Sequence, residues 1–141
     1  MRTNLACAIL ALPLLAGCDP MYGIRLSLVS EKSAALPAGC IASGLRSAGL
    51  AADALANNQL GIRDVGAATN DPSRYWFMAD VSKPNQIDFY SLHMHEPIPC
   101  DSLVKFIPRM REAAQKMQTA CSLSGDDVVV KEKWTQDRCG T

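Results

Sequence analysis

The clearest pattern of apolar and polar positions lies in the C-terminal third of the chain and predicts a helix. Asp101 or Ser102 can cap this helix, which would run to about Cys121. Pro108 interrupts it, so either the helix bends there or its regular part begins near Ile107. Apolar residues recur every three or four positions and form one stripe: Leu103, Phe106, Ile107, Met110, Ala113, Ala114, Met117 and Cys121.

Four segments around this helix have the composition or alternation of strands. Three precede it, at 60–67, 74–81 and 86–95, and the breaks between them contain Asn, Asp, Ser and Pro, which favour turns. Connections this short predict an antiparallel arrangement. After the helix, apolar and polar residues alternate between Val128 and Trp134, which predicts a half-buried strand.

The N-terminal part of the chain predicts a second helix and a tether. Residues 37–56 carry apolar side chains at spacings of four, three, four and three, although Gly44 and Gly49 each cost about 1 kcal/mol relative to alanine. Such small residues would let this helix approach a sheet closely. Residues 18–36 have mostly the composition of a tether, and within them Ile24, Leu26 and Leu28 alternate with other residues, which predicts a short strand.

These elements predict an α+β fold, with a small antiparallel sheet of about four to five strands and two helices packed on one face. We expect residues 37–141 to form this single globular domain. The composition agrees, because 48% of the residues are hydrophobic and 20% are charged. The chain is formally neutral, with 14 basic and 14 acidic residues, and has no basic run, which argues against a nucleic-acid partner.

The first seventeen residues predict a secretory signal peptide. A short start containing Arg2 precedes an apolar stretch at 5–15, which is too short to span a bilayer, and a junction of small residues follows. The segment Leu15-Ala16-Gly17-Cys18 resembles the lipobox of bacterial lipoproteins. A plain secreted protein that is cleaved near Gly17 is the alternative.

The resemblance to lipoproteins implies how the protein is held. The thiol of Cys18 would receive a diacylglycerol, cleavage would fall before Cys18, and its new amino group would be acylated, for example with palmitate. Each buried methylene contributes about 0.8 kcal/mol, so two or three chains anchor a protein firmly. Asp19 resembles the residue that retains enterobacterial lipoproteins in the inner membrane, with the outer membrane as the alternative. In both cases the domain faces the periplasm.

The remaining cysteines predict two disulfides. Cys7 leaves with the signal peptide and Cys18 carries the lipid, which leaves four cysteines in an oxidising compartment: Cys40, Cys100, Cys121 and Cys139. A zinc site is disfavoured, because the chain has no C-x-x-C pair.

Geometry favours one of the three disulfide pairings. Cys100 and Cys121 lie near opposite ends of the predicted helix, about 30 Å apart, and a disulfide needs Cα atoms within about 7 Å. A strand that returns along the helix would bring Cys139 to Cys100. We therefore favour Cys40–Cys121 with Cys100–Cys139, and keep Cys40–Cys100 with Cys121–Cys139 as the alternative.

Only one stretch has metal-ligating chemistry, and no stretch has a catalytic motif. Residues two apart in a strand point to the same side, so His93 and His95 could meet one copper or zinc ion, with Glu96 nearby. The chain has only these two histidines, so the site would be incomplete, and we expect no metal or other cofactor. H-E-x-x-H and G-x-S-x-G are both missing, so we predict no catalytic residues.

We therefore expect a small membrane-anchored envelope lipoprotein with a non-catalytic binding or scaffolding role. Its partner would be an envelope protein or a cell-wall polymer, and Tyr75, Trp76 and Tyr90 are candidate contacts. Basic residues of the long helix, such as Arg109 and Arg111, most simply form a solvated face, which could also meet an anionic polymer. The alternatives are a periplasmic inhibitor or immunity protein, a metal-binding envelope protein that uses the two histidines, and, least favoured, an enzyme.

Overall fold

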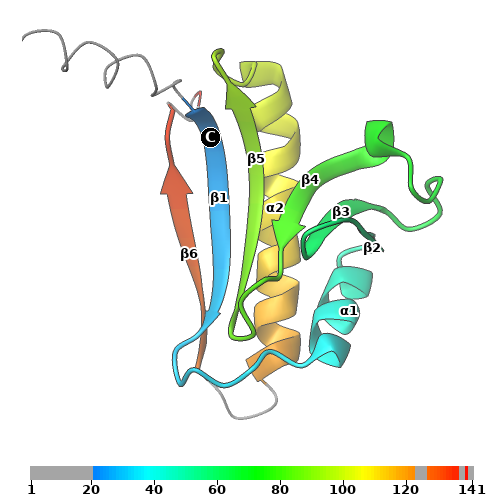
Figure 1. Cartoon of the computed structure of the whole chain (residues 1–141), viewed down its shortest axis with the longest axis vertical. Helices are drawn as coiled ribbons and strands as arrows, with labels where there is room; N and C mark the ends of the chain where they lie inside the picture. Colours follow the sequence, from blue (N-terminus) through cyan, green and yellow to red (C-terminus); the bar gives the residue numbers. More distant parts are fainter. Residues whose placement is uncertain (1–20, 123–126, 137–138, 140–141) are drawn as a thin grey trace, which may run out of the picture.

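Six strands form one antiparallel sheet, accompanied by two α-helices (Figure 1). The structure is a computed structural model that describes residues 21–122, 127–136 and 139. The order of the strands in the sheet is β2-β3-β4-β5-β1-β6. The elements are β1 (Met21–Ser30), α1 (Ala38–Ser47), β2 (Leu50–Ala54), β3 (Gln59–Asp64), the 3-10 turn η1 (Pro72–Arg74), β4 (Tyr75–Asp80), β5 (Gln86–Met94), α2 (Cys100–Ser122) and β6 (Val128–Trp134).

The α+β class and the antiparallel sheet are confirmed, and the sheet has one strand more than the upper number expected. The predicted signal peptide at 1–17, the lipidation residue Cys18 and the sorting residue Asp19 lie outside the described residues. Within the described part of the chain, no helix combines the length and apolar character that crossing a membrane requires.

Strand β1 is a central strand, where we expected mainly a tether. It pairs with β5 from Met21 to Val29 and with β6 from Ile24 to Ser30. The predicted alternation is right, because Leu26 is buried whereas its neighbour Arg25 is exposed. Alternation identifies the buried face of a strand but not its neighbours, and for this reason the central position could not be predicted.

The prediction of one helix over 37–56 is wrong, because α1 ends at Ser47 and β2 follows at once. Gly49 adopts φ 70°, a left-handed conformation that commonly ends helices, and its N–H donates to the carbonyl of Arg46 at 2.9 Å. The carbonyl of Gly49 accepts from the N–H of Val65 at 3.0 Å, which places β2 beside β3. The glycine that weakened the predicted helix is therefore the point where the chain changes structure.

The second glycine of this segment brings the two helices together. A Cβ atom at Gly44 would lie 2.4 Å from Cγ and 2.5 Å from Cα of Met117 in α2. The small residue therefore allows α1 to approach α2, where we expected an approach to the sheet. Helix α2 contacts β1, β4 and β6 and is continuous through Pro108, as one of the two predicted alternatives allowed.

Two disulfides join Cys40 to Cys121 and Cys100 to Cys139, with Cα–Cα distances of 5.0 and 5.6 Å. This is the pairing that the sequence favoured. The first disulfide links α1 to the end of α2, and the second links the start of α2 to the chain after β6.

The core lies between α2 and the sheet. Phe77 of β4 and Phe89 of β5 meet edge to face, with ring centroids 5.5 Å apart. The largest fully buried side chains come from most of the elements: Ile24, Leu26, Leu28, Leu50, Ile62, Phe89, Ile98, Leu103, Ile107, Met110, Met117 and Cys121.

Candidate functional site

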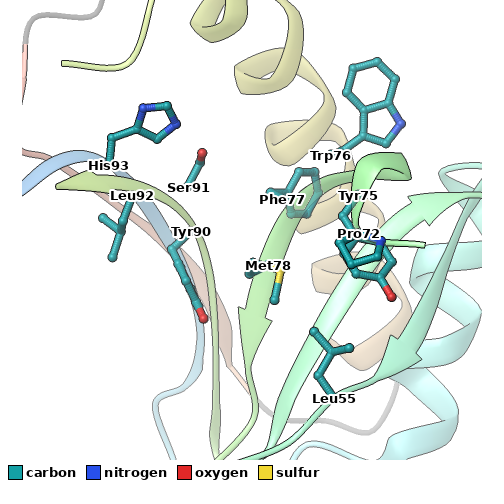
Figure 2. A pocket seen from close by; sticks show the side chains of 10 residues that line it. All are labelled: Leu55, Pro72, Tyr75, Trp76, Phe77, Met78, Tyr90, Ser91, Leu92 and His93. Atoms are coloured by element: carbon teal, nitrogen blue, oxygen red, sulfur yellow. The ribbon is translucent and has the colours of Figure 1, made fainter. Parts of the chain in front are cut away.

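The sheet opens between β4 and β5, and this opening is the candidate site. The two strands pair only over 78–80 and 88–90, although β4 begins three residues earlier and β5 continues to Met94. Beyond the paired part the strands diverge, as Figure 1 shows. A cavity of about 440 Å³ lies there (Figure 2).

A bulge in β4 accounts for the divergence. Ile62 of β3 pairs with Phe77, and the next residue, Arg63, pairs with Tyr75. Trp76 is therefore an extra residue that pairs with no residue of β3. A bulge bends its strand and increases the local twist. The bend therefore turns the start of β4 away from β5 and opens the cleft.

Most of the side chains that line the cleft are apolar or aromatic. Figure 2 shows those of β5 on one side and those of β4 on the other. Tyr75, Trp76 and Tyr90, the three predicted partner contacts, all lie on this lining. The complete lining is Leu55, Pro72, Tyr75, Trp76, Phe77, Met78, Tyr90, Ser91, Leu92 and His93.

A buried ion pair positions Tyr75. Arg63 donates to both carboxylate oxygens of Asp53, at 2.9 to 3.1 Å, and Asp53 and Arg63 are 6% and 7% exposed. Oδ2 of Asp53 also accepts from the Tyr75 hydroxyl at 3.2 Å and from the N–H of Asn70 at 2.7 Å. The ring of Tyr75 covers Gly61, where a Cβ atom would lie 2.3 Å from it. These contacts tie β2, β3, β4 and the β3–β4 connection together.

The same contacts set the ionisation of the group. Hydrogen bonds from Arg63 hold the pKa of the Asp53 carboxyl below its usual value, and Asn70 and Tyr75 act in the same direction. Burial raises the pKa of the Tyr75 hydroxyl, and its hydrogen bond to Asp53 adds to this. The carboxylate is therefore occupied by structural partners and is not available as a base in the cleft.

An arginine from α2 positions Trp76. The guanidinium of Arg109 lies 5.9 Å from the centre of the Trp76 ring, donates to the carbonyl of Ala48 at 3.0 Å and pairs with Asp64 at 2.5 Å. Arg111 pairs in the same way with Glu132 and lies 5.7 Å from the Trp134 ring. Both arginines therefore have partners within the fold, where we expected a solvated face that could also contact an anionic polymer.

A polar hollow of about 410 Å³ adjoins the cleft. Tyr90 and Leu92 line both spaces, and the hollow also contains Arg25, Asp80 and Lys83. Hydrogen bonds from Ser82 lower the pKa of Asp80, and burial raises the pKa of Tyr90. A ligand that extends from the cleft into the hollow would therefore meet apolar surface first and charged groups next.

The metal candidates are not brought together as the sequence suggested. His93 lies in β5 and lines the cleft, but β5 ends at Met94 and His95 has φ 72°, so the rule for residues two apart in a strand does not apply. Glu96 is exposed beyond the strand end. Within the described residues, no three His, Cys, Asp or Glu side chains are grouped so that they could hold a metal ion.

The sequence did not reveal the Asp53–Arg63 pair or the cleft. Asp53 fell inside the predicted helix, so its position opposite β3 was hidden. The available signal was Arg63, a charged residue beside Ile62 in an apolar strand, which needs a buried partner.

A comparison with protein-family models gave no match, and a comparison with curated proteins gave no significant match.

Proposed function

We propose that this protein is a small lipoprotein of the bacterial cell envelope that binds a partner in the cleft between β4 and β5, without catalysis. The observation that carries the binding role is the cleft itself, which Tyr75, Trp76 and Tyr90 all line together with other largely apolar side chains. Interfaces obtain much of their affinity from Trp and Tyr side chains in such hollows. The lipobox-like segment that ends at Cys18 and the two disulfides support an address outside the cytoplasm.

We also infer that both helices cover one face of the sheet and leave the opposite face to the partner. On that opposite face, Arg25 pairs with Tyr90, and Tyr90 pairs with Met78. Cross-strand partners point to the same side of a sheet, so these three side chains would form one continuous surface beside the cleft.

The partner we infer is an extended segment of an envelope protein. Strand β5 runs four residues past its last pair with β4, and among the described residues no strand pairs with that part of its edge. Free N–H and C=O groups on a strand edge can add a further strand, and the flanking hollows then receive its alternate side chains. A cell-wall polymer would use the aromatic rings but would leave these backbone groups unused.

The experiment that tests the binding site compares two tryptophans in similar settings. Both Trp76 and Trp134 lie beside an arginine, but only Trp76 lines the cleft. Crosslinked partners are captured from intact cells that express Trp76→Ala, Trp134→Ala or the unchanged chain, and circular dichroism checks the fold of each.

We expect Trp76→Ala to lower capture of the main partner about thirtyfold, the effect of losing one strong contact, and Trp134→Ala to leave it unchanged. Equal capture by both variants would exclude the cleft as the binding site. A captured glycan in place of a protein would exclude the extended protein segment.

The lipid anchor is tested separately. Cys18→Ser removes the acylated thiol, so we expect the protein to leave the membrane fraction, and persistence there would contradict the anchor. Asp19→Ser should move the lipidated protein from inner-membrane to outer-membrane fractions if Asp19 is a retention signal. An unchanged distribution would show that Asp19 does not sort this protein.

A further inference from the structure

We propose that the end of the sheet formed by Met21 and Met94 lies directly on the lipid bilayer. This inference rests on the lipidation of Cys18 proposed above. It adds an interaction surface, a lipid surface as its partner, and an orientation of the domain.

The length of chain between the anchor and the fold limits how far the domain can stand from the membrane. Met21, the first residue of β1, follows Cys18 by only three residues. Three residues span at most about 11 Å when fully extended. The polar region of one leaflet is about 5–8 Å thick, so Met21 must lie within this region or just outside it.

The fold cannot supply extra length after Met21. Met21 is already paired with Met94, and the pairing continues without interruption to Val29 and Gln86. Strand β1 is also held on its other side by β6 from Ile24 onward. A firmly paired strand therefore begins three residues after the anchor cysteine.

The side chains at this end suit contact with lipid. Met21 and Met94 are directly opposite each other and are 50% and 59% exposed. The other two large apolar side chains that are exposed among the described residues are Val65 and Val104. Flexible, polarisable thioether chains adapt to irregular apolar surroundings, as the boundary between headgroups and acyl chains provides. The exposed methionine pair therefore contacts the lipid bilayer, which the short distance from Cys18 keeps close to this end of the sheet.

This orientation also places the cleft. His93 lines the cleft and directly precedes Met94. With Met94 at the headgroups, the His93 end of the cleft opens close to the membrane surface. The partner in the cleft must then reach the first few ångströms above the bilayer, as the membrane-proximal segment of a membrane protein does.

The test uses the full lipidated chain in vesicles of phosphatidylethanolamine and phosphatidylglycerol. A photoreactive benzoylphenylalanine replaces either Met94 or, as the control, Ser122. Ser122 is exposed and is the last residue of α2, whose end lies far from the start of β1 and the end of β5 (Figure 1). Irradiation is followed by mass spectrometry, which measures lipid adducts at each position and the acylation of Cys18 in the same sample. A third chain with the probe at Met21 repeats the measurement on β1.

We expect about tenfold more lipid adduct at positions 94 and 21 than at position 122, because the interfacial layer is thinner than the domain. Equal adduct at all three positions in an acylated chain would overturn the orientation while leaving the anchor intact. A chain without acylation at Cys18 would instead overturn the proposed anchor, so the two failures are distinguishable.

Discussion

The two halves of the sheet share one apolar core but differ in the length of their strands and in a buried ion pair. Strands β5, β1 and β6 are long, and β1 pairs with β5 over nine residues around the apolar side chains of Ile24, Leu26 and Phe89. Strands β2, β3 and β4 are short, and the buried Asp53–Arg63 ion pair joins β2 to β3. The halves are joined through only three residue pairs between β4 and β5.

This difference explains where a binding site can form. Both halves bury apolar side chains, Leu50, Ile62 and Phe77 among them, and the second half adds a buried ion pair whose hydrogen bonds keep β2 and β3 aligned. The short junction lets the two halves diverge without breaking either set of contacts. The cleft is therefore a consequence of the bulge in β4 and of the short ladder that joins the two halves of the one sheet.

The largest effect is expected in the half that contains β5, β1 and β6. Phe89 is 1% exposed and packs against Phe77, so Phe89→Ala should lower the free energy of unfolding by about 3–5 kcal/mol. Urea unfolding followed by circular dichroism measures this change. Val104→Ala, at an exposed position, is the control and should change stability by less than about 0.5 kcal/mol. A similar loss in both variants would contradict an apolar origin of stability in this half.

The two disulfides should differ in a predictable way. Replacing both cysteines of one disulfide with serine should cost about 2–4 kcal/mol. Cys40 and Cys121 are 81 residues apart and Cys100 and Cys139 are 39 apart, and doubling a loop adds about 0.6 kcal/mol of closure entropy.

Loss of Cys40–Cys121, which connects the helices, should therefore be the more destabilising of the two. Urea unfolding of both double variants under the same oxidising conditions measures the difference. The reverse order would show that native contacts around the Cys100–Cys139 disulfide outweigh loop entropy.

The half that contains β2, β3 and β4 should respond to acid and to one amide substitution. The folded pKa of Asp53 is below its unfolded value of about 3.9, so its stabilising contribution is complete above that pH. The contribution disappears as the pH falls below 3.9 through the folded pKa. Asp53→Asn removes the titrating carboxyl, so this part of the pH dependence of stability should disappear. It also leaves Arg63 without its charge partner.

Hydrogen exchange can distinguish a local from a global effect of Asp53→Asn. The amide of Asn70, which donates to Asp53, and the amides of β2 should exchange faster, while those of β1 and β5 should change less. Uniformly faster exchange would show that the two halves unfold as one unit. Tyr75→Phe keeps the ring over Gly61 and removes only the hydroxyl, so it should give a weaker form of the same pattern.

The smallest effect on stability is expected at the end of β1. Met21→Ser with Met94→Ser changes two exposed side chains, so the free energy of unfolding should change by less than about 0.5 kcal/mol per residue. Urea unfolding of the water-soluble Cys18→Ser chain with and without the double change measures this. A fall of several kcal/mol in the free energy of unfolding would mean that the methionines pack within the fold and are not available to contact lipid.

Local patterns were sufficient where the decisive interactions are local or chemically restrictive. The apolar stripe of α2 required only a period of three to four residues, and the spacing of Cys100 and Cys121 on that helix disfavoured one disulfide pairing. The same reasoning failed at 50–54, because Ala48, Ala52 and Leu55 have the spacing of a helix, whereas Gly49 and pairing with β3 make this segment a strand. The sequence identified Tyr75, Trp76 and Tyr90 as candidate partner contacts but did not reveal the cleft that all three line.

The sequence by itself determined the α+β class, the antiparallel meander of β3, β4 and β5, the long helix, and the even set of cysteines available for disulfides, because each depends on periodicity, turn residues or simple geometry along the chain. Only the tertiary structure decided that β1 lies between β5 and β6, that Asp53 meets Arg63, and that β4 leaves β5 to open a cleft. Those features depend on which distant segments pair and in what register. A residue's neighbours along the chain do not specify its partners across a sheet.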